Sequence, residues 1–226
     1  PGIEDYISHF NAILPAFKDK RYIKCDGKPI FIIYNPSEIS NMAEFIQLWQ
    51  KLAKENGLNG IYFIALCQNF YKECEKVNFY NDMMALGFDA MNVINLRIDR
   101  CEMPFLHRLF YKIIRKLLNT PLLFDYDERA FFSDICFLNE NVYPTIVPNW
   151  DHSPRSGRKG SIMLNTSPEK FQQTLHKMIT RLQYKPLDQR FLFIKSWNEW
   201  AEGNYLEPDM RYGYAWLNAM KNEIIK

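Results

Sequence analysis

An alternation of short apolar runs with segments of helical periodicity is the feature that most limits how this chain can fold. The runs at residues 29–34 (PIFIIY) and 60–66 (GIYFIAL) are rich in Ile and aromatic residues, as is typical of strands buried on both faces of a parallel sheet. Between them, apolar residues recur at helical spacing over residues 42–52, and Gly57 can end that helix. This order predicts a strand, helix, strand unit.

The same order returns later in the chain. A short helical stretch at residues 81–86 precedes the third apolar run, and a helix predicted over residues 168–182 precedes the last one. Ser167 and Pro168 are a favoured N-cap and first helical residue for that second helix. The five predicted strands are residues 29–34, 60–66, 88–94, 143–148 and 190–197.

Strands that alternate with helices predict an α/β fold with a parallel sheet, either open and doubly wound or closed as a (β/α)8 barrel of the TIM type. No GxGxxG or GxxxxGK[ST] motif follows a predicted strand, so the dinucleotide and P-loop folds lose their main signature and the barrel is favoured. A barrel needs eight strands and about 250 residues. Because the 226 residues contain only five predicted strands, we expect an incomplete barrel whose open edges promote self-association.

Charge and cysteine usage argue against several classes of protein. Lys and Arg number 28 against 26 Asp and Glu, so the net charge of +2 gives no broad positive field for nucleic acid. No apolar run reaches the roughly 18–20 residues of a membrane span. Five cysteines without a CxxC pair favour a reducing compartment. We expect a cytoplasmic protein without a nucleic-acid partner or transmembrane segment, and a signal upstream of Pro1 stays open.

Residues 105–118 (FLHRLFYKIIRKLL) predict a basic amphipathic helix. Leu106, Phe110, Ile113 and Leu117 fall on its apolar face. The opposite face is basic: Arg108, Lys112, Arg115 and Lys116. A helix of this type can lie on an anionic membrane surface, which would place the protein at the periphery of the inner membrane. The simpler interpretation, which the sequence favours, is a helix packed on the domain by its apolar face.

The densest group of polar and aromatic residues follows the last predicted strand, at residues 196–209 (SWNEWAEGNYLEPD). In α/β barrels the loops at the carboxyl ends of the strands form the active site. Glu199 and Glu202 are three residues apart, so one helical turn would bring their Cβ atoms to about 5–6 Å. We predict that these two carboxyl groups are the catalytic pair.

Two carboxyl groups beside indole rings suit chemistry at a glycosidic bond, where one protonates the leaving oxygen and the other acts as nucleophile or base. An ExxE pair is also common on solvated helices, but a solvated face has no use for several large aromatic side chains. The predicted substrate-binding residues of this segment are Trp197, Asn198, Trp200, Tyr205 and Glu207.

A second group of polar residues follows the preceding predicted strand, at residues 148–155 (PNWDHSPR). Trp150 suits stacking on a sugar ring, and Asp151, His152 and Arg155 suit hydrogen bonds to its hydroxyl groups. We predict that Trp150, Asp151 and Arg155 bind substrate. Asp151 with His152 is a weak alternative signal for a metal site, because no partner stands at helical or hairpin spacing. We expect no metal and no cofactor.

At these residues the sequence resembles a known family. Residues 197–209 (WNEWAEGNYLEPD), followed by 211–214 (RYGY), resemble the signature of WbsX-type proteins, bacterial glycosyltransferases of surface-polysaccharide loci that are similar to glycoside hydrolase family 99. Weaker matches in the same order are residues 21–24 with 27–29, 87–90, 150–151 with 155, and 166–169.

The resemblance implies a (β/α)8 barrel of which residues 1–226 are a single domain forming the C-terminal part, about five βα units. In family 99 hydrolases the first Glu of an NEWHEG motif assists the sugar 2-hydroxyl in attacking the anomeric carbon, and the second is the general acid/base. These roles fall on Glu199 and Glu202. Ala201 stands where those hydrolases have His, a departure that bears on both their mannoside specificity and their mechanism.

The function implied is glycosyl transfer in the biosynthesis of bacterial surface polysaccharide, such as O-antigen, lipopolysaccharide or capsule. The alternatives are a retaining endo-glycosidase of the family 99 type and a module that binds a glycan without cleaving it. In each case the expected partner is a glycan or oligosaccharide, with self-association covering the missing half of the barrel.

Overall fold

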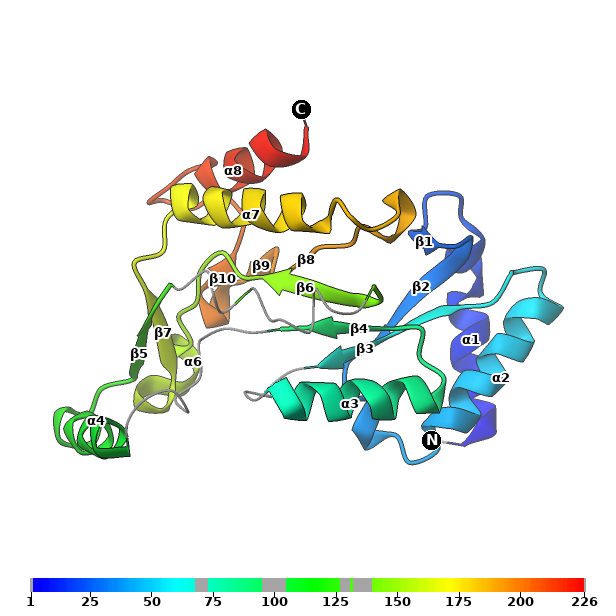
Figure 1. Cartoon of the computed structure of the whole chain (residues 1–226), viewed down its shortest axis with the longest axis horizontal. Coiled ribbons are helices and arrows are strands. Elements are labelled where there is room, and N and C mark those ends of the chain that lie inside the picture. Colours follow the sequence, from blue (N-terminus) through cyan, green and yellow to red (C-terminus); the bar gives the residue numbers. More distant parts are fainter. Residues whose placement is uncertain (1, 68–72, 95–104, 127–130, 132–139, 226) are drawn as a thin grey trace. The chain divides into compact units, whose positions relative to one another are not determined.

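The computed structural model describes residues 2–67, 73–94, 105–126, 131 and 140–225 (Figure 1). The chain divides into two compact units. The first unit is Pro1–Val93, Ile135–Tyr143 and Lys185–Phe191. The second is Ile94–Asp134, Pro144–Tyr184 and Leu192–Lys226. The expectation of a single domain over residues 1–226 stays a prediction.

The first unit is a parallel sheet with three long helices. Its elements are α1 (Ile3–Lys18), β1 (Lys24–Cys25), β2 (Lys28–Ile33), η1 (Pro36–Glu38), α2 (Met42–Glu55), β3 (Tyr62–Cys67), α3 (Glu73–Leu86), β4 (Ala90–Val93), the start of β6 (Val142–Ile146), and η5 (Leu187–Gln189). Strands β2, β3 and β4 are parallel neighbours, and β1 pairs antiparallel with β2. Every residue of β3 and β4 is buried, as expected for central strands of a covered sheet.

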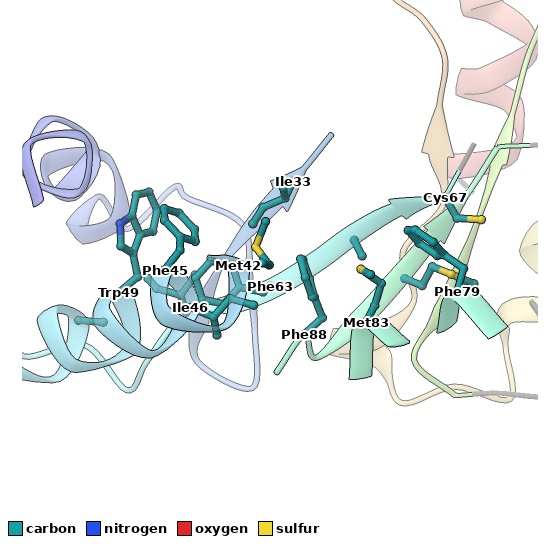
Figure 2. Packing of buried hydrophobic residues seen from close by; sticks show 14 of the residues in the cluster. Ile33, Met42, Phe45, Ile46, Trp49, Phe63, Cys67, Phe79, Met83 and Phe88 are labelled. Atoms are coloured by element: carbon teal, nitrogen blue, oxygen red, sulfur yellow. The ribbon is translucent and has the colours of Figure 1, made fainter. Parts of the chain in front are cut away.

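Trp49 on α2 belongs to the first unit's core and lies beside Phe45 (Figure 2). Its ring is fully buried and packs against the rings of Phe45 and Phe31, with centroid distances of 4.6 and 4.8 Å. Its indole N–H donates to the carbonyl of Tyr6 at 3.0 Å. Trp49 therefore ties α1 and α2 to the sheet. Gly57 follows the end of α2 with a φ of +80°, as predicted for a helix C-terminus.

The second unit has shorter strands and two helices packed together. Its elements are α4 (Phe105–Leu118), β5 (Leu122–Asp125), the end of β6, α6 (Ser153–Ser156), η4 (Gly157–Lys159), β7 (Ser161–Leu164), α7 (Pro168–Leu182), β8 (Phe193–Ile194), β9 (Asn198–Glu199), η6 (Trp200–Glu202), β10 (Asn204–Tyr205) and α8 (Ala215–Ile224). Ser167 caps α7 by accepting from the Lys170 amide, as predicted. The α7 residue Phe171 packs edge-on against Trp216 of α8.

The hydrogen-bonded strand order is β1-β2-β3-β4-β6-β8. The five predicted strands correspond to β2, β3, β4, β6 and β8, and they are consecutive neighbours in that order. The fold is therefore mixed α/β with a six-stranded sheet that is compatible with part of a barrel. Closure as a (β/α)8 barrel of the TIM type, and self-association through open edges, stay predictions.

The structure corrects the sequence-based expectations at several elements. Strand β8 covers only Phe193–Ile194, because the chain turns into the loop of the candidate site directly after it. A further parallel pair, β5 with β7, was not predicted. Helix α4 has the predicted bounds, but its apolar face is not packed: Leu106, Phe110, Ile113 and Leu117 are each between 49% and 78% exposed. None of the helices in the described ranges is long and apolar enough to cross a bilayer.

Replacing Trp49 tests the core of the first unit. Trp49→Ala removes a fully buried ring and the hydrogen bond to Tyr6, so we expect the free energy of unfolding to fall by about 3–5 kcal/mol. Leu187→Ala, at a side chain that is 81% exposed in the same unit, is the control, and we expect a change within about 0.5 kcal/mol. Urea unfolding followed by circular dichroism measures both, and equal effects of the two variants would contradict this packing.

Candidate functional site

The candidate site lies where two loops of the second unit meet. One loop follows β6 and the other follows β8, and these two strands are parallel neighbours. Their carboxyl ends therefore point the same way, which brings both loops to one edge of the sheet. The amide of Asp151 in the first loop donates to the carbonyl of Glu202 in the second at 2.8 Å. The two predicted clusters are thus in direct contact.

The loop after β8 folds into a small hairpin that contains both predicted catalytic residues. Strands β9 and β10 pair antiparallel, with Glu199 opposite Asn204. One turn of 3-10 helix, η6, connects Glu199 to Glu202, in place of the α-helical turn that the spacing suggested. Gly203 then reverses the chain with a φ of +51°. Its position is tight, because a Cβ added there would lie 2.7 Å from the Cβ of Asp151.

Glu202 is the most strongly held acidic residue of the site. Its side chain is only 15% exposed, and its Oε1 accepts from Nη1 of Arg155 at 2.9 Å. Its other oxygen, Oε2, accepts from Nζ of Lys195 at 3.1 Å. Nε2 of His152 lies 3.7 Å from Oε1. A carboxylate so far withdrawn from water needs partners of this kind, because an unpaired buried charge is costly.

Glu199 shares a partner with Glu202. Its Oε1 lies 3.5 Å from Nη2 of Arg155, and its side chain is 38% exposed. Because the two carboxyl groups contact the two terminal nitrogens of one guanidinium, their contacting oxygens are at most about 9 Å apart, which does not exceed the longest separations of about 9.5 Å in glycosidases. The structure thus brings the predicted catalytic pair together, with Glu199 the more open of the two.

The predicted substrate-binding residues of the first loop have contacts that hold the loop itself. Trp150 is buried, and its indole N–H donates to Oγ of Ser161 at 3.0 Å. Nζ of Lys195 lies 4.7 Å from the centroid of the Trp150 ring, a cation–π contact that also places the Lys195 charge beside Glu202. Oδ1 of Asp151 accepts from the amide and the hydroxyl of Ser153. Arg155 is the one of the three predicted residues that reaches the carboxyl pair.

The predicted aromatic residues of the second loop form an open surface beside the carboxyl pair. Trp200 stacks on Tyr205 with the ring centroids 3.8 Å apart and an interplanar angle of 13°. Its indole N–H donates to Oε2 of Glu207 at 2.6 Å, which fixes the ring. Trp200 and Trp197 remain 46% and 52% exposed, and Asn198 is exposed between Trp197 and Glu199. Two indole faces are therefore accessible from solvent.

Tyr205 is the inner layer of this stack. Burial, with the nearby Asp209 carboxylate as a further cause, raises the pKa of its hydroxyl group to about 12. The backbone of Tyr205 is fixed by the side chain of Asn149, which accepts from its amide and donates to its carbonyl. The side chain of Asn149 thus makes the two backbone hydrogen bonds that a neighbouring strand would otherwise make with Tyr205.

Several residues that organise the site were not predicted. Lys195 contacts Glu202, and Asn149 supports Tyr205. Asn204 is fully buried and accepts from the amide of Ser196, whose hydroxyl group in turn accepts from the amide of Glu199. Lys195 directly follows an apolar strand, which is the one signal in the sequence that could have drawn attention to it.

The site as a whole combines a buried carboxylate, a more open carboxylate and exposed indole faces at the ends of parallel strands. The described residues include no group of three or more His, Cys, Asp or Glu side chains placed to hold a metal ion. An α/β protein with this set of side chains has the composition of a glycan site, in which indole faces stack on sugar rings and carboxylates contact their hydroxyl groups and glycosidic oxygens.

Comparison with known proteins gives the family. The model of a family described as "Glycosyltransferase WbsX" matches residues 2–220, and the chain belongs to this family. Two curated relatives, both named "Uncharacterized protein WxcX", come from two strains of Xanthomonas campestris pv. campestris and are 28% and 27% identical over 99% of the chain. The chain spans 30% of the length of these relatives. No solved structure matches it.

Two glycines in left-handed conformations allow a matched test of the hairpin. Gly203 and Gly213 have φ values of +51° and +53°, but a Cβ at Gly213 meets nothing within 4 Å, whereas at Gly203 it meets Asp151. We expect Gly213→Ala to destabilise the chain by about 1 kcal/mol through backbone strain alone. Gly203→Ala adds the clash and should cost about 2–4 kcal/mol in total. Thermal unfolding measures the difference, and equal costs would contradict the close approach to Asp151.

Proposed function

We propose that this chain contains the two catalytic carboxyl groups of a carbohydrate-active enzyme that acts at glycosidic bonds. The enzyme is proposed to be a glycosyltransferase of bacterial surface polysaccharide. The observation that supports this most strongly is the pair of carboxyl groups, Glu199 and Glu202, gathered at one guanidinium beside exposed indole faces. Membership of the WbsX glycosyltransferase family supports the same class of reaction.

The two carboxyl groups lie in different environments, and glycosyl chemistry requires two different roles of such a pair. One group has to give a proton to the leaving oxygen, and the other has to act on the opposite face of the sugar. Following the order of the two Glu residues in the family motif, we assign the first role to Glu202 and the second to the more open Glu199. Glu202 has to take up a proton before it can act, so its ion pairs with Arg155 and Lys195 have to loosen when substrate binds. Arg155 contacts both, so it orients them as a pair.

The aromatic stack supplies the binding surface. Sugar rings present apolar C–H faces that pack on indole rings. One face of the Trp200 ring stacks on Tyr205, and its indole N–H donates to Glu207. Because the Trp200 ring is already fixed, it loses little conformational entropy when a glycan binds, and little of the binding free energy of the contact is offset.

A second candidate is a retaining hydrolase of the family 99 type, because a pair of carboxyl groups beside indole faces suits hydrolysis as well as transfer. A third is a glycan-binding module without catalysis. This candidate is favoured by one observation: both oxygens of Glu202 are engaged by cationic side chains. Product analysis on the complete protein with an oligosaccharide acceptor separates transfer, hydrolysis and binding.

Glu202→Gln in the complete protein tests the catalytic assignment. The amide keeps the size of the side chain but cannot donate the proton, so we expect turnover to fall by about a hundredfold to ten-thousandfold with glycan affinity nearly unchanged. An activated aryl glycoside, whose leaving group scarcely needs protonation, should partly rescue Glu202→Gln and not Glu199→Gln. Glu44→Gln, at an exposed position on α2, is the control. Full activity of both site variants on natural glycan would refute the assignment.

Trp200→Ala tests the binding surface separately. Loss of a stacking face weakens the ground state and the transition state together, so we expect KM to rise more than kcat falls. Trp200→Phe keeps an aromatic face but loses the hydrogen bond to Glu207, and should lie between the wild type and Trp200→Ala. Steady-state kinetics over a range of glycan concentrations gives both constants. A fall confined to kcat would place Trp200 outside the binding surface.

A further inference from the structure

Helix α4 presents an apolar surface that the rest of the described chain leaves open. Leu106, Phe110 and Leu117 are 73%, 64% and 78% exposed, and Ile113 between them is 49% exposed. These four residues fall on one face of the helix. In Figure 1, α4 (dark green) lies at the far end of the β5 and β7 pair, well separated from α7 and α8 of the same unit. Apolar side chains scattered singly on a surface are ordinary, but a continuous stripe of four on one helix is not.

The charges of α4 are of one sign. Its 14 residues include four Lys or Arg and no Asp or Glu. Lys112 and Lys116 are exposed on the side away from the apolar stripe. The chain as a whole has a net charge of only +2, so this concentration of positive charge is local to the helix.

A basic turn lies against the end of α4. Nη2 of Arg115 donates to the carbonyl of Arg158 in η4, and Nη1 of Arg158 donates to Oδ1 of Asn119, just after the helix. Arg158 and the next residue, Lys159, are both exposed. The turn therefore extends the cationic surface beyond α4, and its hydrogen bonds hold the end of the helix against η4 of the same unit.

We infer that α4 binds the surface of an anionic lipid bilayer, with its apolar stripe in the boundary between headgroups and acyl chains. The helix is too short to cross the bilayer, and the pairing of an apolar face with a uniformly cationic face is the arrangement of interfacial helices. The charge argues for this occupant over a second copy of the chain, because an anionic surface is complementary to the positive charge of α4, whereas a second α4 would carry the same positive charge. Lipid binding by α4 is independent of the chemistry proposed for Glu199 and Glu202.

Vesicle flotation with the complete protein tests the inference. We expect binding to vesicles of phosphatidylglycerol and little binding to vesicles of phosphatidylcholine, with the bound fraction falling as salt is raised. The double variant Phe110→Asp/Leu117→Asp should weaken binding at least about tenfold, because it puts two charges into the apolar boundary. Leu187→Asp, at an exposed apolar residue of the first unit, should leave binding unchanged.

Two charge-reversal variants separate the contribution of α4 to lipid binding from the effect of the net charge of the whole chain. Lys112→Glu/Lys116→Glu and the control Lys18→Glu/Lys20→Glu alter the net charge equally, and all four lysines are exposed. We expect only the first pair to lose binding to phosphatidylglycerol. Three results would overturn the inference: equal binding to both lipids, α4 variants that bind normally, or α4 variants that unfold the protein or lower its mass in sedimentation. The third result would show that a protein surface covers the helix.

Discussion

The ion pairs of Glu202 with Arg155 and Lys195 are the interaction on which the candidate site depends. The pair with Arg155 joins the loop after β6 to the loop after β8, although Arg155 and Glu202 are 47 residues apart in sequence. The desolvation of Glu202 makes the two cations necessary, because a buried carboxylate that loses one partner keeps the full penalty of the uncompensated charge. Arg155 also contacts Glu199. This one side chain therefore connects the two loops and limits the distance between the two carboxyl groups.

The surrounding structure makes that arrangement rigid. Trp150 lies beneath Lys195 and fixes the position of its charge, while the carboxylate of Asp151 binds the first turn of α6, the helix that bears Arg155. On the other side, Asn149 fixes the backbone of Tyr205, on which Trp200 stacks. Residues predicted to touch substrate thus divide into two groups, those that hold the loops and those that leave an open aromatic face. Under the proposed function, the first group positions the catalytic pair and the second binds the glycan.

The sequence predicted the five neighbouring strands and the bounds of α4 and α7, because apolar runs and helical periodicity are local signals. It also placed both clusters of site residues at strand ends. It did not predict β5 and β7, which are partly exposed and lack the continuous apolar runs of the buried strands. It also did not predict that Arg155 is shared by Glu199 and Glu202, because these contacts join residues far apart in sequence. The apolar face of α4 was expected to be packed and is exposed. A pattern shows that a helix has two faces, and only the tertiary structure shows what covers them.

A double-mutant cycle between Arg155 and Glu202 tests the central claim, that the ion pair positions the catalytic carboxyl group. Turnover is measured for the complete protein and for Arg155→Met, Glu202→Gln and the double variant. Because Arg155 is proposed to act through Glu202, the double variant should be little worse than Glu202→Gln alone, a strong departure from additivity. If the two losses simply multiply, or if Arg155→Met leaves turnover intact, Arg155 does not position Glu202 and the central claim is wrong.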